Sequence, residues 1–361
     1  MLRTCGRLTI LLAALVMILG LNAGATRADL GPGEAQKAAA PKERAQAQPA
    51  EGAKKEGNKE EAEEKKEEPK GDECPSTFGP IITDTAIPIE KGKFAVQPTF
   101  GLSFTTHNFS PSWRRVSAGG DFQSFGMSWK FTYGLWDNLE VYTVIPFIYK
   151  WANDVNRNQS GPNGERSANF AGIGDINLTL KYRLVEEGPI APTVSAIFAP
   201  TFPTGHFRHL NPGRLGTDAI GSGSYAFTTG FNVSKYVKPF IFYGNFYYTP
   251  QTSFTTDEVD DNGNPVQRRN HPRDFITVNL AAEYPITKKW VALLELTSFW
   301  DAGRIVGPKA TAQPAALVSL VPGIEYMATD KFSLALGVSI DLAGKNTSGN
   351  ITPLLSMVYA F

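Results

Sequence analysis

The chain has 361 residues, with 35 basic and 35 acidic side chains, so its formal net charge is zero and gives no reason to expect a nucleic-acid partner. No uninterrupted apolar stretch reaches the roughly 20 residues that a membrane-spanning helix requires, which excludes a helical membrane protein. The 11% aromatic content and the 34 glycines favour a chain rich in β-strands.

Residues 1–25 have the pattern of a secretory signal peptide. Two arginines precede an apolar core over residues 10–21, and small residues at 23 and 25 form a cleavage site. Cleavage after residue 28 is the alternative. We therefore expect Sec-type export, which leaves Cys74 as the single cysteine of the mature chain and excludes a disulfide framework.

Residues 26–74 form a low-complexity segment. Eight glutamates and six lysines fall within residues 51–70, and the segment has few side chains that could form a core. Because it cannot offset its ordering entropy by burial, we expect a disordered periplasmic linker. A tether to the peptidoglycan layer is the alternative. Residues 75–92 come next, and we expect them to enter or underlie the following domain as a partial plug.

Residues 93–361 alternate between apolar and small or polar side chains with a period of two. In 331–342, for example, every even position is apolar and every odd position is small or polar. Segments of this kind match the 9–11 residues of a tilted transmembrane strand. Twelve strands are predicted, at 94–104, 121–133, 138–150, 173–185, 191–201, 222–233, 239–249, 273–284, 289–300, 315–326, 331–341 and 351–361.

The connections between these strands alternate between short turns and long loops, the last long loop being 342–350. Short periplasmic turns, long extracellular loops and an even strand number are typical of bacterial outer-membrane barrels. The predicted fold is therefore all-β, a transmembrane antiparallel up-and-down barrel of about 12 strands in the outer membrane. A soluble β-sandwich, whose apolar faces would point inward, is the rival.

Aromatic residues at strand ends favour the barrel, because such residues form girdles at the two membrane interfaces. The chain also ends on an aromatic residue, Phe361, with Tyr359 on the same face of the last strand. This ending resembles the signal that the barrel assembly machinery recognises, so that machinery is an expected partner.

Inward-facing charges are the first candidates for functional residues, because ionisable groups at membrane depth persist where they face water or partners. The predicted lumen or constriction charges are Lys130, Glu140, Lys181, Arg183, Glu283, Glu295 and Glu325. Since their signs are mixed, bracing of the barrel by salt bridges is favoured over a selective constriction. Inward aromatic side chains, which could guide an aromatic solute or fill a narrow lumen, are Phe122, Tyr142, Tyr243, Tyr247 and Phe275.

The predicted long loops carry most of the arginines, whereas lysines crowd the short turns. Guanidinium groups match phosphate geometry, so lipopolysaccharide is an expected partner beside the outer-membrane lipid. Loop solubility explains the same arginines equally well. These loop arginines are Arg114, Arg115, Arg157, Arg166, Arg208, Arg214, Arg268, Arg269, Arg273 and Arg304.

An enzyme is not predicted. The four histidines lie in predicted loops, and the pair His206 and His209 has no adjacent cysteine or carboxylate to complete a metal site. No nucleophile motif or phosphate-binding loop is present. We therefore expect no catalytic residues, no metal and no cofactor.

Three stretches resemble a known family. Residues 78–85 (FGPIITDT) lead through 90–93 (EKGK) into the first strand, and GIGDINLTLKYRL at 172–184 and APTFPTG at 199–205 follow. From Phe78 to Phe361 the chain is similar to the outer-membrane transporter family labelled MetA-pathway phenol-degradation proteins. The resemblance implies a twelve-stranded barrel that lets small hydrophobic or aromatic compounds cross the outer membrane.

Two functions follow from these observations. The first is an outer-membrane channel for small hydrophobic or aromatic solutes. The alternative is a non-conducting structural or adhesive barrel, in which the long loops and the charged linker do the work.

Overall fold

The computed structural model of the chain describes residues 77–259, 265–305 and 307–361. The predicted signal peptide at 1–25 and the predicted linker at 26–74 lie outside the described residues. Within the described ranges, no helix combines the length and the apolar character needed to cross a bilayer.

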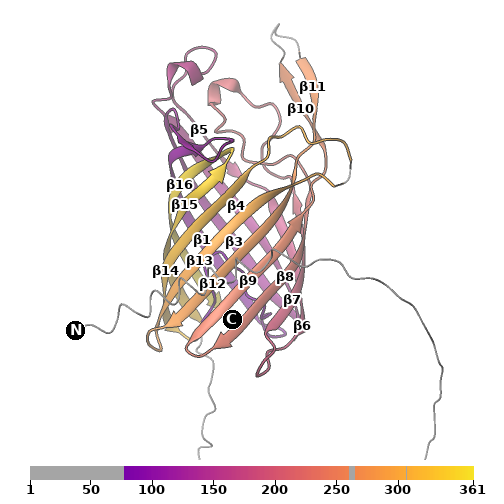
Figure 1. The fold of residues 1–361 in the computed structure, drawn as a ribbon, viewed down its shortest axis with the longest axis vertical. Coiled ribbons are helices and arrows are strands. Elements are labelled where there is room, and N and C mark those ends of the chain that lie inside the picture. Colours follow the sequence, from indigo (N-terminus) through magenta and orange to yellow (C-terminus); the bar gives the residue numbers. More distant parts are fainter. Residues whose placement is uncertain (1–76, 260–264, 306) are drawn as a thin grey trace, which may run out of the picture. The chain divides into compact units, whose positions relative to one another are not determined.

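Most of the described chain forms one antiparallel sheet of fourteen strands, twelve of which close into a barrel (Figure 1). The twelve strands are β1 (Phe94–Phe109), β3 (Asp121–Trp136), β4 (Leu139–Asn153), β6 (Ile176–Val185), β7 (Thr193–Phe202), β8 (Ala226–Val237), β9 (Phe240–Thr249), β12 (Asp274–Pro285), β13 (Trp290–Gly303), β14 (Ala316–Thr329), β15 (Phe332–Lys345) and β16 (Thr347–Ala360). The short strands β2 (Arg115–Val116) and β5 (Ala168–Ile173) add to β1 and β4.

The barrel closes by pairing its first strand with its last. The β1–β16 register runs from Ala95 opposite Ala360 to Phe109 opposite Thr347, and the Phe361 amide donates to the Phe94 carbonyl at 2.8 Å. Closure matters because an open edge would leave backbone groups without partners in hydrocarbon. The predicted twelve-stranded barrel is confirmed.

The two faces of the wall are the reverse of those of a soluble protein. On β15, Leu336 is 56% exposed on the outside while Ser333 is 1% exposed on the inside. On β6, Leu180 is 41% exposed while Lys181 next to it is 1% exposed. Apolar side chains on the outside of a closed barrel fit lipid, not water, so the structure rules out the soluble β-sandwich.

The end of the sheet nearest the long loops differs from the prediction. Strands β15 and β16 are joined by Asn346 alone, which has a positive φ of 48°, so the predicted long loop at 342–350 is wrong. A separate hairpin, β10 (Phe254–Val259) with β11 (Pro265–Asn270), projects beyond the barrel (Figure 1). Strand segments above the bilayer need no apolar face, so the alternation that identifies the other strands is missing from them.

The wall changes partner along β4. Strand β4 pairs with β6 over Leu139–Val144 and with β5 over Phe147–Ala152, so the strand predicted at 173–185 is interrupted. At the interruption, the carboxylate of Asp175 accepts the amides of Gly205 at 3.0 Å and Ser222 at 2.7 Å. Asp175, which lies between β5 and β6, therefore binds both ends of the loop that follows β7.

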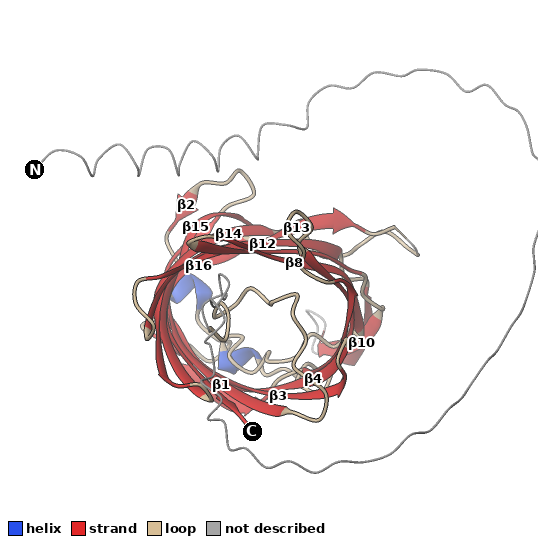
Figure 2. Ribbon diagram, turned by 90° about the horizontal axis from the view of Figure 1, so that it is seen from below, coloured by secondary structure: helices blue, strands red, loops and turns tan. Residues whose placement is uncertain are grey.

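Two short 3-10 helices, η1 (Arg157–Gln159) and η2 (Pro212–Arg214), lie in the loops. Seen along the barrel, the ring of strands surrounds loop segments that cross its interior (Figure 2). The residues that hold one of these segments define the site described next.

Candidate functional site

The segment that precedes β1, residues 77–92, makes hydrogen bonds or ion pairs to inward-facing side chains of eight barrel strands, which are β3, β4, β6, β7, β8, β9, β13 and β14. We call it the pre-barrel segment. The Ala86 amide donates to the Ser234 hydroxyl at 2.8 Å, Ser195 donates to the Ala86 carbonyl, and the Ile89 amide donates to Glu140 at 2.7 Å. The segment is thus fixed inside the barrel by polar contacts at many points.

Glu295 is the strongest single anchor of the pre-barrel segment. Its carboxylate accepts three consecutive backbone amides, from Ile81 at 2.8 Å, Ile82 at 3.2 Å and Thr83 at 2.7 Å. The carboxylate is fully buried, and hydrogen bonds to a charged acceptor are stronger than those between neutral groups. Next to these bonds, the Ile81 side chain packs in a small apolar cluster with Val291, Leu293 and Ala335.

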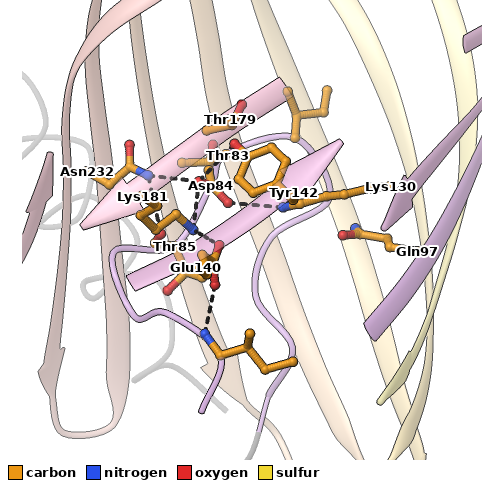
Figure 3. A network of polar contacts seen from close by, with 12 residues as sticks. Thr83, Asp84, Thr85, Gln97, Lys130, Glu140, Tyr142, Thr179, Lys181 and Asn232 are labelled. Atoms are coloured by element: carbon orange, nitrogen blue, oxygen red, sulfur yellow. Dashed lines mark hydrogen bonds and ion pairs between the residues drawn. The ribbon is translucent and has the colours of Figure 1, made fainter. Parts of the chain in front are cut away.

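Asp84 is the centre of the second anchor (Figure 3). Its carboxylate lies 2.8 Å from the Lys181 ammonium and 3.3 Å from the Lys130 ammonium, and the Asn232 amide donates to it at 2.8 Å. Lys181 lies 2.9 Å from Glu140 as well. Two cations and two anions therefore balance one another inside the barrel, with Lys181 between the carboxylates.

The pre-barrel segment lies outside the membrane-spanning strands, and the charge state of Asp84 follows from its neighbours. Burial would raise the pKa of the Asp84 carboxyl, but Lys130 and Lys181 lower the pKa to about 2. Since this lies below the ordinary value, the stabilisation by ionised Asp84 is complete above about pH 4 and is lost as the pH falls through about 2. Asp84 is therefore ionised at neutral pH, as its ion pairs with Lys130 and Lys181 require.

The predicted lumen charges fall into two groups and one outlier. Lys130, Glu140 and Lys181 meet around Asp84, while Glu283, Glu295 and Glu325 are buried on the neighbouring strands β12, β13 and β14. Thr77 donates to Glu325 at 2.8 Å, and Tyr243 donates to Glu283 at 2.9 Å. Arg183 stands apart, with its guanidinium 3.8 Å from the exposed carboxylate of Glu186.

The predicted lumen aromatics divide by height along the barrel. Tyr142, Tyr243 and Tyr247 belong to the site, where Tyr142 lies under the Lys130 ammonium at 4.1 Å and Tyr247 donates to Asn232 at 2.5 Å. Phe122 and Phe275 lie nearer the long loops, and Phe275 contacts Phe299 edge-on at 5.5 Å.

The sequence analysis did not identify the residues that join the pre-barrel segment to β8 and β9. Asp84, Asn232 and Asn245 were not among the candidates, although Asn245 binds both the amide and the carbonyl of Asp84. Phe299 was also missed. Asn232 and Asn245 stand opposite each other on β8 and β9, and a polar pair on the inward face was the available signal.

The predicted assembly signal lies on the outside of the barrel, at the seam where β16 pairs with β1. Tyr359 is 44% and Phe361 is 61% exposed, and their rings contact edge-on at 4.7 Å. Phe361 contacts Phe94 at 5.6 Å across the seam.

Nothing in the described ranges brings three His, Cys, Asp or Glu side chains together as a metal-binding group. His206 binds the Asp218 carbonyl at 2.9 Å, and His209 lies 3.7 Å from Asp257 at an exposed position. Several loop arginines bind within the protein: Arg273 makes two bonds to Asp301, and Arg304 binds the Pro272 carbonyl at 3.0 Å.

Gly134 marks where the pre-barrel segment turns into β1. A β-carbon on Gly134 would lie 2.1 Å from the carbonyl oxygen of Glu90. Gly134→Ala is therefore expected to destabilise the protein by about 1–3 kcal/mol through overpacking. The heat-induced mobility shift on electrophoresis should occur at a lower temperature. Gly126→Ala on the same strand is the matched control, because a β-carbon there meets nothing within 4 Å; equal shifts for the two variants would contradict the prediction.

The chain was compared with known proteins by sequence and by fold. A sequence model of the family described as MetA-pathway of phenol degradation matches residues 129–352. No curated protein matches the sequence. Among solved structures, the COG4313 outer membrane channel from Pseudomonas putida F1 is similar with a TM-score of 0.60 and 15% identity, over 76% of this chain and 98% of that chain.

Two further solved structures are more distant. The translocator domain of the autotransporter NalP from Neisseria meningitidis has a TM-score of 0.44 and 13% identity, over 76% of this chain and 90% of that chain. The CymD monoaromatic hydrocarbon channel has a TM-score of 0.39 and 10% identity, over 76% and 89%. At these identities, the similarity to the first structure shows a shared barrel fold and no more.

Proposed function

The chain belongs to the family described as MetA-pathway of phenol degradation and is a bacterial outer-membrane β-barrel, and we propose that it is a channel for small hydrophobic or aromatic solutes. The observation that carries the proposal is the polar interior. Charged side chains such as Lys130 line a lumen that also contains cavities, inside a wall whose exterior is apolar. The cavities leave room for a solute beside the pre-barrel segment, which supports a channel over a scaffold.

The aromatic class of solute is supported by the upper lumen. Phe122, Phe275 and Phe299 face inward on the side of the long loops, and aromatic rings contact one another edge-on or offset. The family description points to phenolic compounds as well. The proposal assigns no catalytic role to any residue.

We propose that the pre-barrel segment acts as a partial plug. It crosses the lumen at the level of Asp84 and is anchored by Glu295, Glu140 and Asn245. Its anchors include the predicted lumen charges, so these residues would set the width of the lumen by holding the segment, in addition to bracing the wall.

Two partners belong to the same proposal. Arg114, Arg157 and Arg208 are exposed in the long loops, where their guanidinium groups would meet lipopolysaccharide phosphates. Tyr359 and Phe361 are exposed on the last strand, where the barrel assembly machinery would bind them.

Conductance and solute flux test the channel. Purified full-length mature protein should give discrete conductance steps in a planar bilayer, and proteoliposomes that contain it should swell in isotonic benzoate faster than empty liposomes. A barrel that produces neither signal would refute the channel and favour the non-conducting structural or adhesive barrel.

A further inference from the structure

The pre-barrel segment does not fill the barrel evenly. In the half of the lumen that it occupies, the inward side chains of the strands from β6 to β15 are buried, as Lys181, Asn232, Glu283 and Glu295 show with exposures of 0–1%. On β1 and β3, the inward side chains at the same level stay half-buried, among them Gln97, Thr99, Ser128 and Lys130. The segment is therefore packed more tightly against the strands from β6 to β15 than against β1 and β3.

A cavity of about 340 Å³ lies on the other side. It lies between residues 78–85 and the wall at Gln97, Thr99 and Ser128. Lys130 and Tyr142, which contact Asp84, line it as well. A second cavity, of about 460 Å³, shares Gln97 and Lys130 with the first and reaches the short turns at Lys93 and Asp330. The two cavities thus adjoin along β1 and β3, and the second extends to the end of the barrel that carries Phe361.

Beside β1 and β3, open space also continues from the first cavity toward the long loops. Gly101 on β1 is opposite Gly126 on β3, and a β-carbon added to Gly126 would meet nothing within 4 Å. Further along the same strands, a cavity of about 670 Å³ is lined by Asn108, Phe122 and Ser348.

We propose that solutes pass between the pre-barrel segment and the β1–β3 wall, beside the contact of Asp84 with Lys130 and with the segment in place, and that Lys130 contacts an oxygen substituent of the solute there. This inference rests on the proposed channel function and adds the path and the solute class. The path does not require the segment to leave the barrel.

Lys130 differs from the other charges at the site. Its side chain is 24% exposed, whereas the side chains of Lys181 and Glu140 are 1% and 4% exposed. Its ammonium makes a long 3.3 Å contact to Asp84, and an ammonium has three donors. Phe78 and Val144 line the same cavity with apolar surface. A small aromatic molecule with a hydroxyl or carboxylate group fits this combination.

A disulfide that locks the segment distinguishes the path from its alternative. The hydroxyl oxygens of Thr85 and Ser234 are 3.4 Å apart, so cysteines at both positions are placed to bond after small side-chain rotations. The variant would carry Thr85→Cys, Ser234→Cys and Cys74→Ser in the full mature chain. Conductance and benzoate-driven swelling are compared between its oxidised and reduced forms, with mass spectrometry to verify the bond.

We expect the oxidised form to conduct within two-fold of the reduced form. Loss of conductance on oxidation, with recovery on reduction, would overturn the proposed path and leave the channel function intact, since solutes would then pass when the segment leaves. No conductance in either form or in the parent protein would overturn the channel function and the path with it.

Blocking the path is the complementary test. Gly126→Phe puts a large side chain into the open lumen beside the path and should lower conductance at least five-fold. Gly244→Phe is the matched control, because Gly244 faces outward on β9 with ordinary contact distances. Equal conductance of the two variants would overturn the path.

Charge selectivity tests the role of Lys130. In a gradient of potassium benzoate, Lys130→Met should shift the reversal potential toward the potassium equilibrium potential, because the half-buried cation beside the path is lost. An unchanged reversal potential would overturn the contact between Lys130 and the solute.

Discussion

Replacing Glu295 with alanine is expected to raise the single-channel conductance several-fold, because the pre-barrel segment loses its strongest anchor. Three backbone amides, those of Ile81, Ile82 and Thr83, would lose their common acceptor. A buried donor left without a partner costs about 1–3 kcal/mol. The part of the segment around Ile81, Ile82 and Thr83 would then detach and expose these amides to water, which leaves a wider lumen.

The measurement is planar-bilayer conductance, supported by thiol labelling of a cysteine at Ile82, which should react faster in the variant. Glu325→Ala is the matched control. That carboxylate accepts the hydroxyl of Thr77 and so anchors only the first residue of the segment. Glu295→Gln keeps one acceptor oxygen and should give an intermediate conductance. Equal conductance of Glu295→Ala and the parent protein would show that the segment does not limit the lumen.

Replacing Lys181 with methionine is expected to lower the unfolding temperature of the barrel more than any other single change at the site. Lys181 is 1% exposed and lies between the carboxylates of Asp84 and Glu140, at 2.8 Å and 2.9 Å. Removing one partner of a buried ion pair leaves an uncompensated charge, which costs about 3–5 kcal/mol. The heat-induced mobility shift in detergent measures the effect.

Two comparisons separate charge from packing. Arg183→Met, two residues further along β6, removes an ion pair of 3.8 Å to an exposed glutamate and should change stability by less than about 1 kcal/mol. Adding Asp84→Asn and Glu140→Gln to Lys181→Met removes the stranded anions and should restore much of the lost stability. If the triple variant is as unstable as Lys181→Met, lost packing and not charge explains the effect.

The fold could be predicted because a membrane barrel repeats one simple pattern. In 331–342 the alternation alone identifies the strand and its outward face, and Leu336 and Ser333 occupy the sides so assigned. The alternation is required only where a strand contacts lipid, so strands outside the bilayer were not predicted correctly. The turn at Asn346 and the hairpin β10–β11 lie beyond the bilayer, where polar residues on both faces are tolerated.

The site was only partly predictable for a different reason. Inward position identifies Lys130, Glu140, Lys181 and Glu295 as unusual, because charges in a wall strand need a reason. It does not give their partners, since a side chain that points into a lumen can meet any segment that enters it. Asp84 precedes the first strand by ten residues, and no periodicity ties it to Lys181.

The anchors of the pre-barrel segment also constrain biogenesis. The bonds of Ile81 to Glu295 and of Thr77 to Glu325 join positions 214 and 248 residues apart. Contacts of such separation form late, because a long loop of chain has to close first. In a nascent molecule, the pre-barrel segment therefore reaches its final position only after the carboxy-terminal strands have formed. Any folding intermediate that lacks those strands has a barrel interior that the segment does not yet occupy.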